Sequence, residues 1–270
     1  MFDHPEFITW VFAFIFFVFG TIFGSFGNVL IYRIPLKKNI AWPGSACPKC
    51  KASVLWRDNI PIASWILLKG KCRSCQEPIS MRYPLVEFLM GLTFASLFLQ
   101  VGFSWILIEY LIFSFGLIVV AFIDLDHMIL PDIFTWPGMG LGLLGAAINP
   151  ERSFLDSLGG AALGFGFLYS IASIYMLIRK EEGMGGGDIK LLGWIGAVLG
   201  WKSTPFVILA SSIIGSIIGI ILAIRTKGGL KSTIPFGPYL VIAAFAYIFG
   251  GEAISRWYLS FFLPGLVPSH

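Results

Sequence analysis

The sequence predicts an all-α polytopic membrane protein. Of its 270 residues, 57% are hydrophobic and 13% are charged, whereas soluble domains carry about 25% charged residues. The mean hydropathy is +0.83. This composition excludes a soluble globular enzyme. A fibrous or disordered chain is also excluded, because the sequence has no G-X-Y period and no polar low-complexity tract.

About eight segments are long and apolar enough to form helices that cross the bilayer, which takes roughly 17 to 25 residues. A barrel is not expected, because the alternating pattern of barrel strands is absent and lipid offers no partner to unpaired backbone groups. The expected spans are residues 7–32, 84–101, 103–123, 131–149, 154–178, 188–201, 204–225 and 235–250.

The distribution of basic residues predicts the orientation. With eight spans, sixteen of the 19 Lys and Arg residues, Lys227 and Lys231 among them, fall on one side of the membrane, and Arg152, Lys202 and Arg256 fall on the other. The positive-inside rule makes the basic side cytoplasmic and places both termini outside. The net charge of +4 therefore reflects loop bias and requires no nucleic-acid partner, although the basic loop could attract anionic membrane lipid.

A cytoplasmic loop at residues 34–83 is the one segment long enough to be a small folded insert, which divides the chain into a first helix (1–33), this loop domain (34–83) and a membrane core (84–270). The loop contains the pairs Cys47-x2-Cys50 and Cys72-x2-Cys75, separated by 21 residues. Four thiolates at such spacing favour one structural, tetrahedral zinc ion in a zinc-ribbon-like fold. Disulfides, free thiols and a catalytic thiol remain as alternatives.

Two aspartates are expected at helix ends on the cytoplasmic face. Asp124 ends the third apolar span, with Asp126 and His127 expected in the following loop and Pro131 and Asp132 opening the next span. Asp188 opens the sixth span after a stretch that includes Gly183, Gly185 and Gly187, whose backbone can come close to a peptide. Two carboxylates that share a proton can activate water against a peptide bond. Each aspartate could instead cap its helix.

Other acids in or beside the spans are candidates because burying a charge there is costly. Glu87 starts the second span, where it complements the helix dipole or has a functional role. Asp156 lies in the first turn of the fifth span, and a structural role is expected. Glu109 lies within the third span and has no assigned role.

Taken together, several motifs resemble those of the type IV prepilin peptidases, a family of polytopic aspartyl proteases that are also N-methyltransferases. The motifs extend almost from end to end: GSFGNVLIYRIP at 24–35, the two CxxC pairs, DNIPIASWILLKGKCRSC, SMRYPLVEF, DLDHMILPD, GMGGGDIKLLG and IPFGPYL at 234–240. Gly27 departs from the family pattern, which more often has Leu there. A close helix contact would explain Gly20, Gly24 and Gly27 equally well.

The resemblance implies that Asp124, which has six residues between it and the corner at Pro131, and Asp188 form the catalytic pair, whereas Asp126 lies two residues too late. Supporting positions for the substrate or the loop are Gly185, Gly187, Lys190, Pro131, Asp132 and Glu87. It also implies cleavage of the basic leader of prepilins and pseudopilins at the cytoplasmic face of the bacterial inner membrane, for pilus biogenesis or type II secretion. S-adenosylmethionine-dependent methylation of the new N-terminus follows from the resemblance alone.

Two other classes of protein use some of these features. A proton- or cation-coupled transporter would use intramembrane acids, but it would not explain the four-cysteine loop. An assembly scaffold would explain the loop, but it would not explain two aspartates at helix ends on the same face of the membrane.

Overall fold

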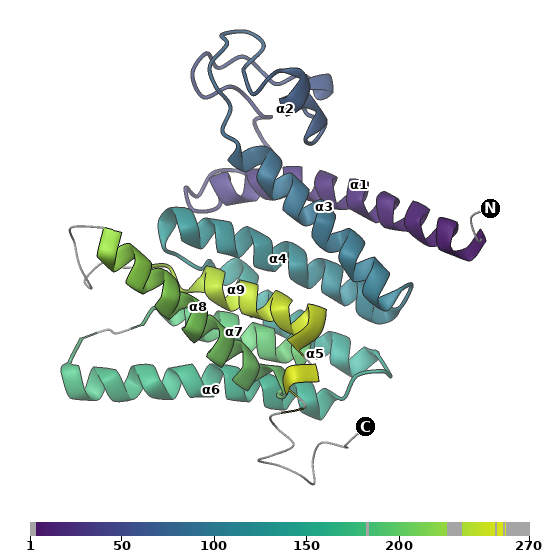
Figure 1. The fold of residues 1–270 in the computed structure, drawn as a ribbon. Coiled ribbons are helices and arrows are strands. Elements are labelled where there is room, and N and C mark those ends of the chain that lie inside the picture. The colour runs from purple at the N-terminus through teal and green to yellow at the C-terminus, as the bar shows by residue number, and fades with distance from the viewer. Residues whose placement is uncertain (1–3, 182–183, 226–233, 252, 256, 258–270) are drawn as a thin grey trace. The chain divides into compact units, whose positions relative to one another are not determined.

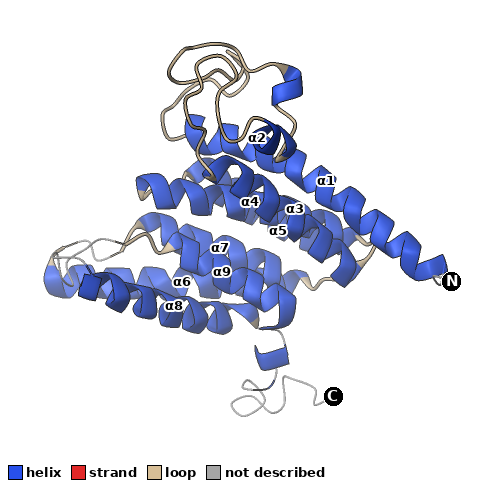
Figure 2. Cartoon of the chain, turned by 45° about the horizontal axis from the view of Figure 1, so that its top comes forward, coloured by secondary structure: helices blue, strands red, loops and turns tan. Residues whose placement is uncertain are grey.

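The computed structural model describes residues 4–181, 184–225, 234–251, 253–255 and 257. Gly183, Lys227, Lys231 and Arg256 lie outside them. Regular structure in the described residues is helical, and no strand occurs among them (Figures 1 and 2). The helices are α1 (His4–Arg33), η1 (Trp56–Asp58), α2 (Ala63–Leu67), α3 (Arg82–Val101), α4 (Trp105–His127), α5 (Asp132–Ile148), α6 (Phe154–Arg179), α7 (Gly186–Leu199), α8 (Ser203–Arg225) and α9 (Gly237–Ala246), which continues into η3 (Tyr247–Gly251).

Each expected membrane span coincides with one of these helices. Five of the described helices, α1, α3, α4, α6 and α8, are long and apolar enough to cross a membrane. The other three are shorter: α5 has 17 residues, α7 has 14 and α9 has 10. A multi-pass helical membrane protein is therefore confirmed, and the count of eight crossings stays a prediction.

One expected boundary is wrong. Asp126 and His127 were expected in a loop, but α4 continues through His127. No Gly or Pro lies between Asp124 and Met128, and the helix ends where Met128 adopts a positive φ of 54°. Asp124 therefore lies within the last helical turn and is held by the helix backbone.

Residues up to Val119 form one compact unit. In it, α1 and α3 run antiparallel and in close contact, because a Cβ on Gly20 would lie 2.6 Å from the Met90 carbonyl oxygen and one on Gly24 would lie 2.6 Å from the Glu87 Cα. Gly27 instead faces the Val119 side chain of α4. The expectation that these glycines form close helix contacts is confirmed.

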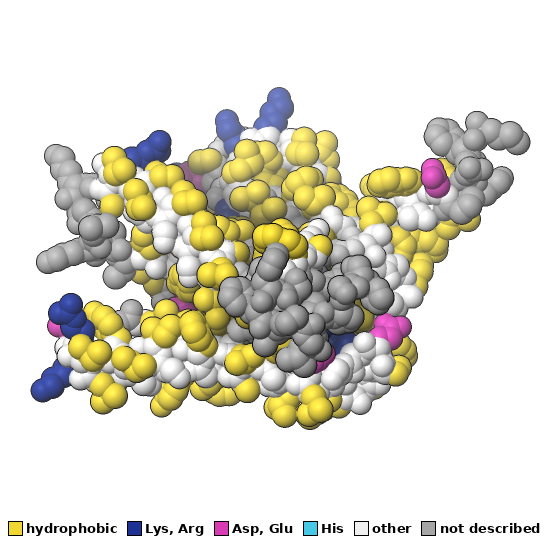
Figure 3. All heavy atoms as spheres, turned by 60° about the horizontal axis from the view of Figure 1, so that its bottom comes forward, with side chains coloured by type: hydrophobic (Ala, Val, Ile, Leu, Met, Phe, Trp, Pro, Cys, Tyr) yellow, Lys and Arg dark blue, Asp and Glu magenta, His cyan; other side chains and the backbone are white. Residues whose placement is uncertain are grey.

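Residues from Val120 onward form the second unit, with α7 at its centre. Leu191, Leu192 and Ile195 of α7 are fully buried. Helices α5 and α6 both pack on α7 through glycines, which explains how a short helix can be apolar on every side. The outward faces of α6 and α8 carry exposed apolar side chains such as Leu177 and Ile224, which suit contact with lipid. Figure 3 shows apolar side chains over the face of the molecule that it presents.

Polar contacts fix the ends of the helices in this second unit. Arg152 donates hydrogen bonds to the carbonyl oxygens of Ala197 (2.8 Å) and Val198 (2.7 Å), near the C-terminal end of α7. Asp156 accepts a hydrogen bond of 3.1 Å from the indole N–H of Trp201. These contacts support the structural role expected for Asp156.

The contact between α6 and α7 is testable through Gly160. A Cβ at Gly160 would overlap the backbone of Gly196, so Gly160→Ala should lower the free energy of unfolding by about 1–3 kcal/mol, as overpacking does. The thermal unfolding midpoint in detergent is the measurement.

Gly166→Ala is the matched control on the same helix. A Cβ at Gly166 meets nothing within 4 Å, and Ala favours the helix by about 1 kcal/mol over Gly, so this variant should be at least as stable as the wild type. Equal destabilisation by both substitutions would contradict the packing account.

Candidate functional site: two aspartates and a four-cysteine loop

Asp124 is a buried carboxylate with a defined hydrogen-bond donor. It is 4% exposed, and its Oδ2 accepts the Gly237 backbone N–H at 3.0 Å. Gly237 is the first residue of α9, so the donor belongs to the electropositive end of a helix. A Cβ at Gly237 would lie 2.7 Å from that same Oδ2. Only glycine allows this approach without displacing the carboxylate.

Asp188 occupies the first turn of α7, which begins after Gly185. Its Oδ1 is buried and has no hydrogen-bond partner among the described residues. The turn before Asp188 is tightly packed, because a Cβ at Gly187 would lie 2.7 Å from the Leu130 Cβ. Glycine is therefore required at position 187 for this turn to pack closely against Leu130.

The structure brings Asp124 and Asp188 together. Leu130 contacts the positions of both Gly187 and Gly237, so the starts of α7 and α9 converge on one side chain. Asp188 lies in the first turn of α7, and the Asp124 carboxylate is hydrogen-bonded to the first residue of α9. The convergence of these two helix starts therefore brings both aspartates to one site.

Asp126 is in a different environment from Asp124. Its side chain is exposed, although it lies only two residues further along the same helix. The helical twist turns it away from the buried face that carries Asp124. The structure thus distinguishes the two neighbours as the sequence analysis expected.

A salt bridge joins the starts of α5 and α7. Lys190 Nζ lies 2.6 Å from Asp132 Oδ1 and 5.9 Å from the centre of the Trp136 ring. Pro131 precedes α5 as its N-cap and accepts backbone hydrogen bonds from the first turn. Lys190, Asp132 and Pro131 therefore hold the helix starts on which the site depends.

Sequence analysis missed Gly237 and Leu130. Gly237 stands in the IPFGPYL motif, between Phe236 and Pro238, and a Gly-Pro pair at a helix start was the available signal. No sequence pattern marked Leu130 as part of the site, because an apolar residue beside a proline is common in membrane helices.

The four cysteines form a second cluster. Their sulfur atoms all lie within 4.8 Å of one another, with Cys47 and Cys75 at 3.8 Å and Cys50 and Cys72 at 4.0 Å. Four thiolates bound at 2.3 Å around one zinc ion would be about 3.8 Å apart. The donor set therefore fits one tetrahedral metal ion.

Each cysteine pair forms the same turn. The residue after the second cysteine has a positive φ in both pairs, 60° at Lys51 and 59° at Gln76. In the first pair, backbone N–H groups of Cys50 and Lys49 point at the Cys47 sulfur and lower the pKa of its thiol to about 6. This polarisation favours the thiolate that a metal requires.

Ion pairs connect the two turns and the segment between them. Lys49 pairs with Glu77 across the turns. Arg73 donates hydrogen bonds of 2.8 and 2.6 Å to the Asp58 carboxylate and lowers its pKa. The loop is therefore cross-linked by side chains as well as by the cysteine cluster.

Glu87 attaches this loop to the helices of the first unit. It is 8% exposed, and its Oε2 accepts the backbone N–H of Ile62 at 2.7 Å. Ile62 has a positive φ of 59°, which is strained for a β-branched residue. The helix α1 also packs closely at this point, because a Cβ on Gly24 would lie 2.6 Å from the Glu87 Cα. Glu87 thus ties α1, α3 and the strained DNIPI segment together.

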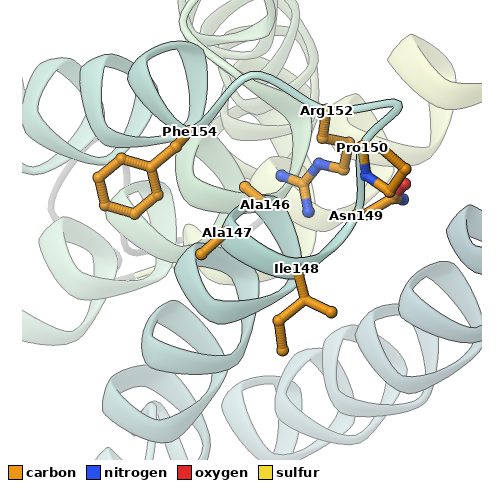
Figure 4. A pocket seen from close by; sticks show the side chains of 7 residues that line it. All are labelled: Ala146, Ala147, Ile148, Asn149, Pro150, Arg152 and Phe154. Carbon is orange, nitrogen blue, oxygen red and sulfur yellow. The ribbon is translucent and has the colours of Figure 1, made fainter.

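A shallow pocket of about 560 Å³ lies away from these clusters, at the connection between α5 and α6 (Figure 4). It is lined by Ala146, Ala147, Ile148, Asn149, Pro150, Arg152 and Phe154. Arg152 is occupied by carbonyl oxygens, and the lining contains no acid. This pocket offers no group suited to hydrolysis.

Helices long enough to span a membrane, together with two aspartates that converge at helix ends, define a membrane protein of the aspartic peptidase type. Comparison with known families agrees. Residues 18–101 match the Bacterial Peptidase A24 N-terminal domain, and residues 111–220 match the Type IV leader peptidase family.

Curated relatives cover nearly the whole chain. A prepilin leader peptidase/N-methyltransferase of Aeromonas hydrophila is 37% identical over 95% of this chain and 97% of its own length. The protein of the same name from Pseudomonas aeruginosa is 36% identical over 90% and 91%. A type 4 prepilin-like proteins leader peptide-processing enzyme of Escherichia coli is 39% identical over 85% and 91%. The chain belongs to the type IV leader peptidase family. No solved structure matches it.

The role of Glu87 in holding the loop is testable by amide hydrogen exchange at Ile62. Glu87→Ala should speed exchange at this amide about tenfold or more, because a hydrogen bond to a charged group contributes about 1.5–3 kcal/mol. Glu77→Ala, which removes an ion pair elsewhere in the loop, is the control and should leave Ile62 unchanged. Unaltered exchange at Ile62 in Glu87→Ala would contradict the assignment.

Proposed function

We propose that the chain is a membrane-embedded aspartic endopeptidase that cleaves the basic leader from type IV prepilins and pseudopilins, with Asp124 and Asp188 as its catalytic pair. The observation that carries the proposal is the convergence of two aspartates from separate helix ends, one with a buried carboxylate and the other with a buried carboxyl oxygen. The names of the relatives support the choice of substrate.

The environments of the two aspartates suggest their roles. The Gly237 N–H donated to Asp124 favours the ionised form of that carboxylate. Asp188 has a buried oxygen without a donor among the described residues, which suits the protonated member of the pair. Asp124 then takes a proton from water as the water oxygen attacks the peptide carbonyl carbon, and Asp188 protonates the carbonyl oxygen. The resulting gem-diol collapses as the C–N bond breaks: Asp124 gives its proton to the leaving amine, and Asp188 takes a proton back from a diol hydroxyl, which leaves a carboxyl product and the pair in its starting state.

Residues around the pair have supporting roles in this proposal. Gly185 and Gly187 let the backbone before Asp188 approach Leu130 and an extended substrate. Pro131, Asp132 and Lys190 fix the starts of α5 and α7. Glu87 supports the cysteine loop.

The orientation and location complete the proposal. The basic loops place the aspartate pair on the cytoplasmic face of the bacterial inner membrane, with both termini outside. The first helix (1–33), the loop (34–83) and the core (84–270) are the proposed functional divisions. The basic loop also suits contact with anionic lipid headgroups.

The second proposed activity is methylation of the new N-terminus with S-adenosylmethionine as donor. The names of the relatives include this activity. The loop and the adjoining end of α1 are the cytosolic material available for it. We assign no residue to the methyl donor and derive no step of that reaction.

The metal in the cysteine cluster is proposed to be one structural zinc ion. Its ligands are Cys47, Cys50, Cys72 and Cys75, and the sulfur separations support the choice. A loop with little apolar core of its own depends on such an ion for its fold.

Replacement of either aspartate tests the peptidase proposal. Asp124→Asn and Asp188→Asn should each abolish cleavage of a full-length prepilin while expression and membrane insertion persist. Asp126→Asn is the matched control, and its effect should be mild because that side chain is exposed. An inactive Asp126→Asn beside an active Asp124→Asn would reverse the assignment.

Metal analysis tests the zinc proposal. Purified, reduced protein should contain about one zinc per chain. A Cys47→Ser and Cys72→Ser double variant should lose the ion, and its loop should become sensitive to protease. Metal-free protein with a disulfide detected by mass spectrometry would refute the zinc site.

A further inference from the structure

Thr135 and Thr204 are the buried hydroxyl side chains of the described helices whose oxygens have no hydrogen-bond partner. Thr21, Ser114 and Ser211 each donate a hydrogen bond to a carbonyl oxygen one turn earlier in their own helix. Thr135 is completely buried, and its Oγ1 has no hydrogen-bond partner among the described residues. An unpaired buried hydroxyl costs about 1–3 kcal/mol, so its retention calls for an explanation.

The packing of α5 on α7 locates this hydroxyl. The two helices run parallel, and three contacts fix their register: Asp132 with Lys190, Gly138 with Trp194, and Gly142 with Val198. Thr135 belongs to the same buried stripe as Gly138 and Gly142. It therefore faces α7 between Lys190 and Trp194, about one helical turn from Asp188.

A second unpartnered buried oxygen lies at this end of α7. It is the Oδ1 of Asp188, which belongs to the pair assigned above. A hydroxyl can both donate and accept, and a carboxyl oxygen can accept. One water molecule between Thr135 and Asp188 would satisfy both groups.

We propose that Thr135 is a positioning residue for the aspartate pair, which it orients by a water-mediated hydrogen bond to Asp188. This inference rests on the proposed peptidase function. It assigns Thr135 no contact with the substrate, so loss of the hydroxyl should slow the chemical step and leave substrate binding intact.

Three variants test the proposal by the cleavage kinetics of a full-length prepilin. Thr135→Val removes the hydroxyl at nearly constant shape and should lower kcat about 10- to 100-fold, as misplacement of a catalytic group does. KM should stay within about threefold of the wild type, because a positioning role affects the reacting geometry. Thr135→Ser keeps the hydroxyl and should restore kcat to within about threefold, since its oxygen can make the same bond.

Thr204→Val is the matched control. Thr204 is also a buried threonine with an unpartnered Oγ1, but it lies in the first turn of α8. Its replacement should leave kcat unchanged.

Wild-type kcat in Thr135→Val would overturn the proposal, as would a Thr135→Ser variant as slow as Thr135→Val. An equal loss in Thr204→Val would overturn it as well. Asp188→Asn in the same assay separates the two hypotheses. If that variant is inactive while Thr135→Val is active, only the role of Thr135 fails, whereas an active Asp188→Asn refutes the peptidase assignment itself.

Discussion

The hydrogen bond from the Gly237 N–H to the Asp124 carboxylate is the contact on which the arrangement of the aspartate site depends. It joins the end of α4 to the start of α9, which are far apart in the sequence. Because a side chain at Gly237 would displace the carboxylate, the bond also sets the residue type at that position. Leu130 then fills the space between the starts of α7 and α9, and this brings Asp188 close to Asp124.

The central position of α7 follows from the same requirement for close approach. Gly160 and Gly164 of α6 meet the backbone of α7 directly, whereas Gly138 and Gly142 of α5 make room for the Trp194 and Val198 side chains of α7. Arg152 binds carbonyl oxygens at one end of α7, and the salt bridge of Lys190 with Asp132 holds the other end. A helix held at both ends can present Asp188 rigidly, as an electrostatically preorganised site requires.

The cysteine loop is organised by a different principle. Most of its large apolar side chains, such as Trp42, Trp56 and Leu67, are exposed, so the four sulfur atoms, two ion pairs and the Glu87 contact to Ile62 hold it together. Glu87 of α3 links this loop to the helices by accepting the backbone N–H of Ile62. The carboxylate is therefore required at this position as a hydrogen-bond acceptor of the right reach.

Much of this architecture could be predicted from the sequence. Apolar length located the helices, and the CxxC spacing located the four sulfur atoms that converge in the structure. The glycine beside Asp188 was also recognised. The end of α4 could not be predicted, because no Gly or Pro follows Asp124 until Pro131 and the positive φ of Met128 has no sequence signal.

The partners of the acids were equally hidden from the sequence. The bonds from Gly237 to Asp124 and from Ile62 to Glu87 are donated by backbone N–H groups, which every residue except proline possesses. The buried Thr135 hydroxyl without a hydrogen-bond partner was also hidden, because burial and the lack of a partner can be recognised only in the packed structure.

The most direct test of the central claim is an experimental structure with a substrate-like peptide that carries a hydroxyl in place of the scissile carbonyl. If Asp124 and Asp188 act as one catalytic pair, that hydroxyl should lie between them, within hydrogen-bond distance of a carboxyl oxygen of each. A hydroxyl bound to Asp126, or to only one of the two buried aspartates with the other distant, would contradict the account.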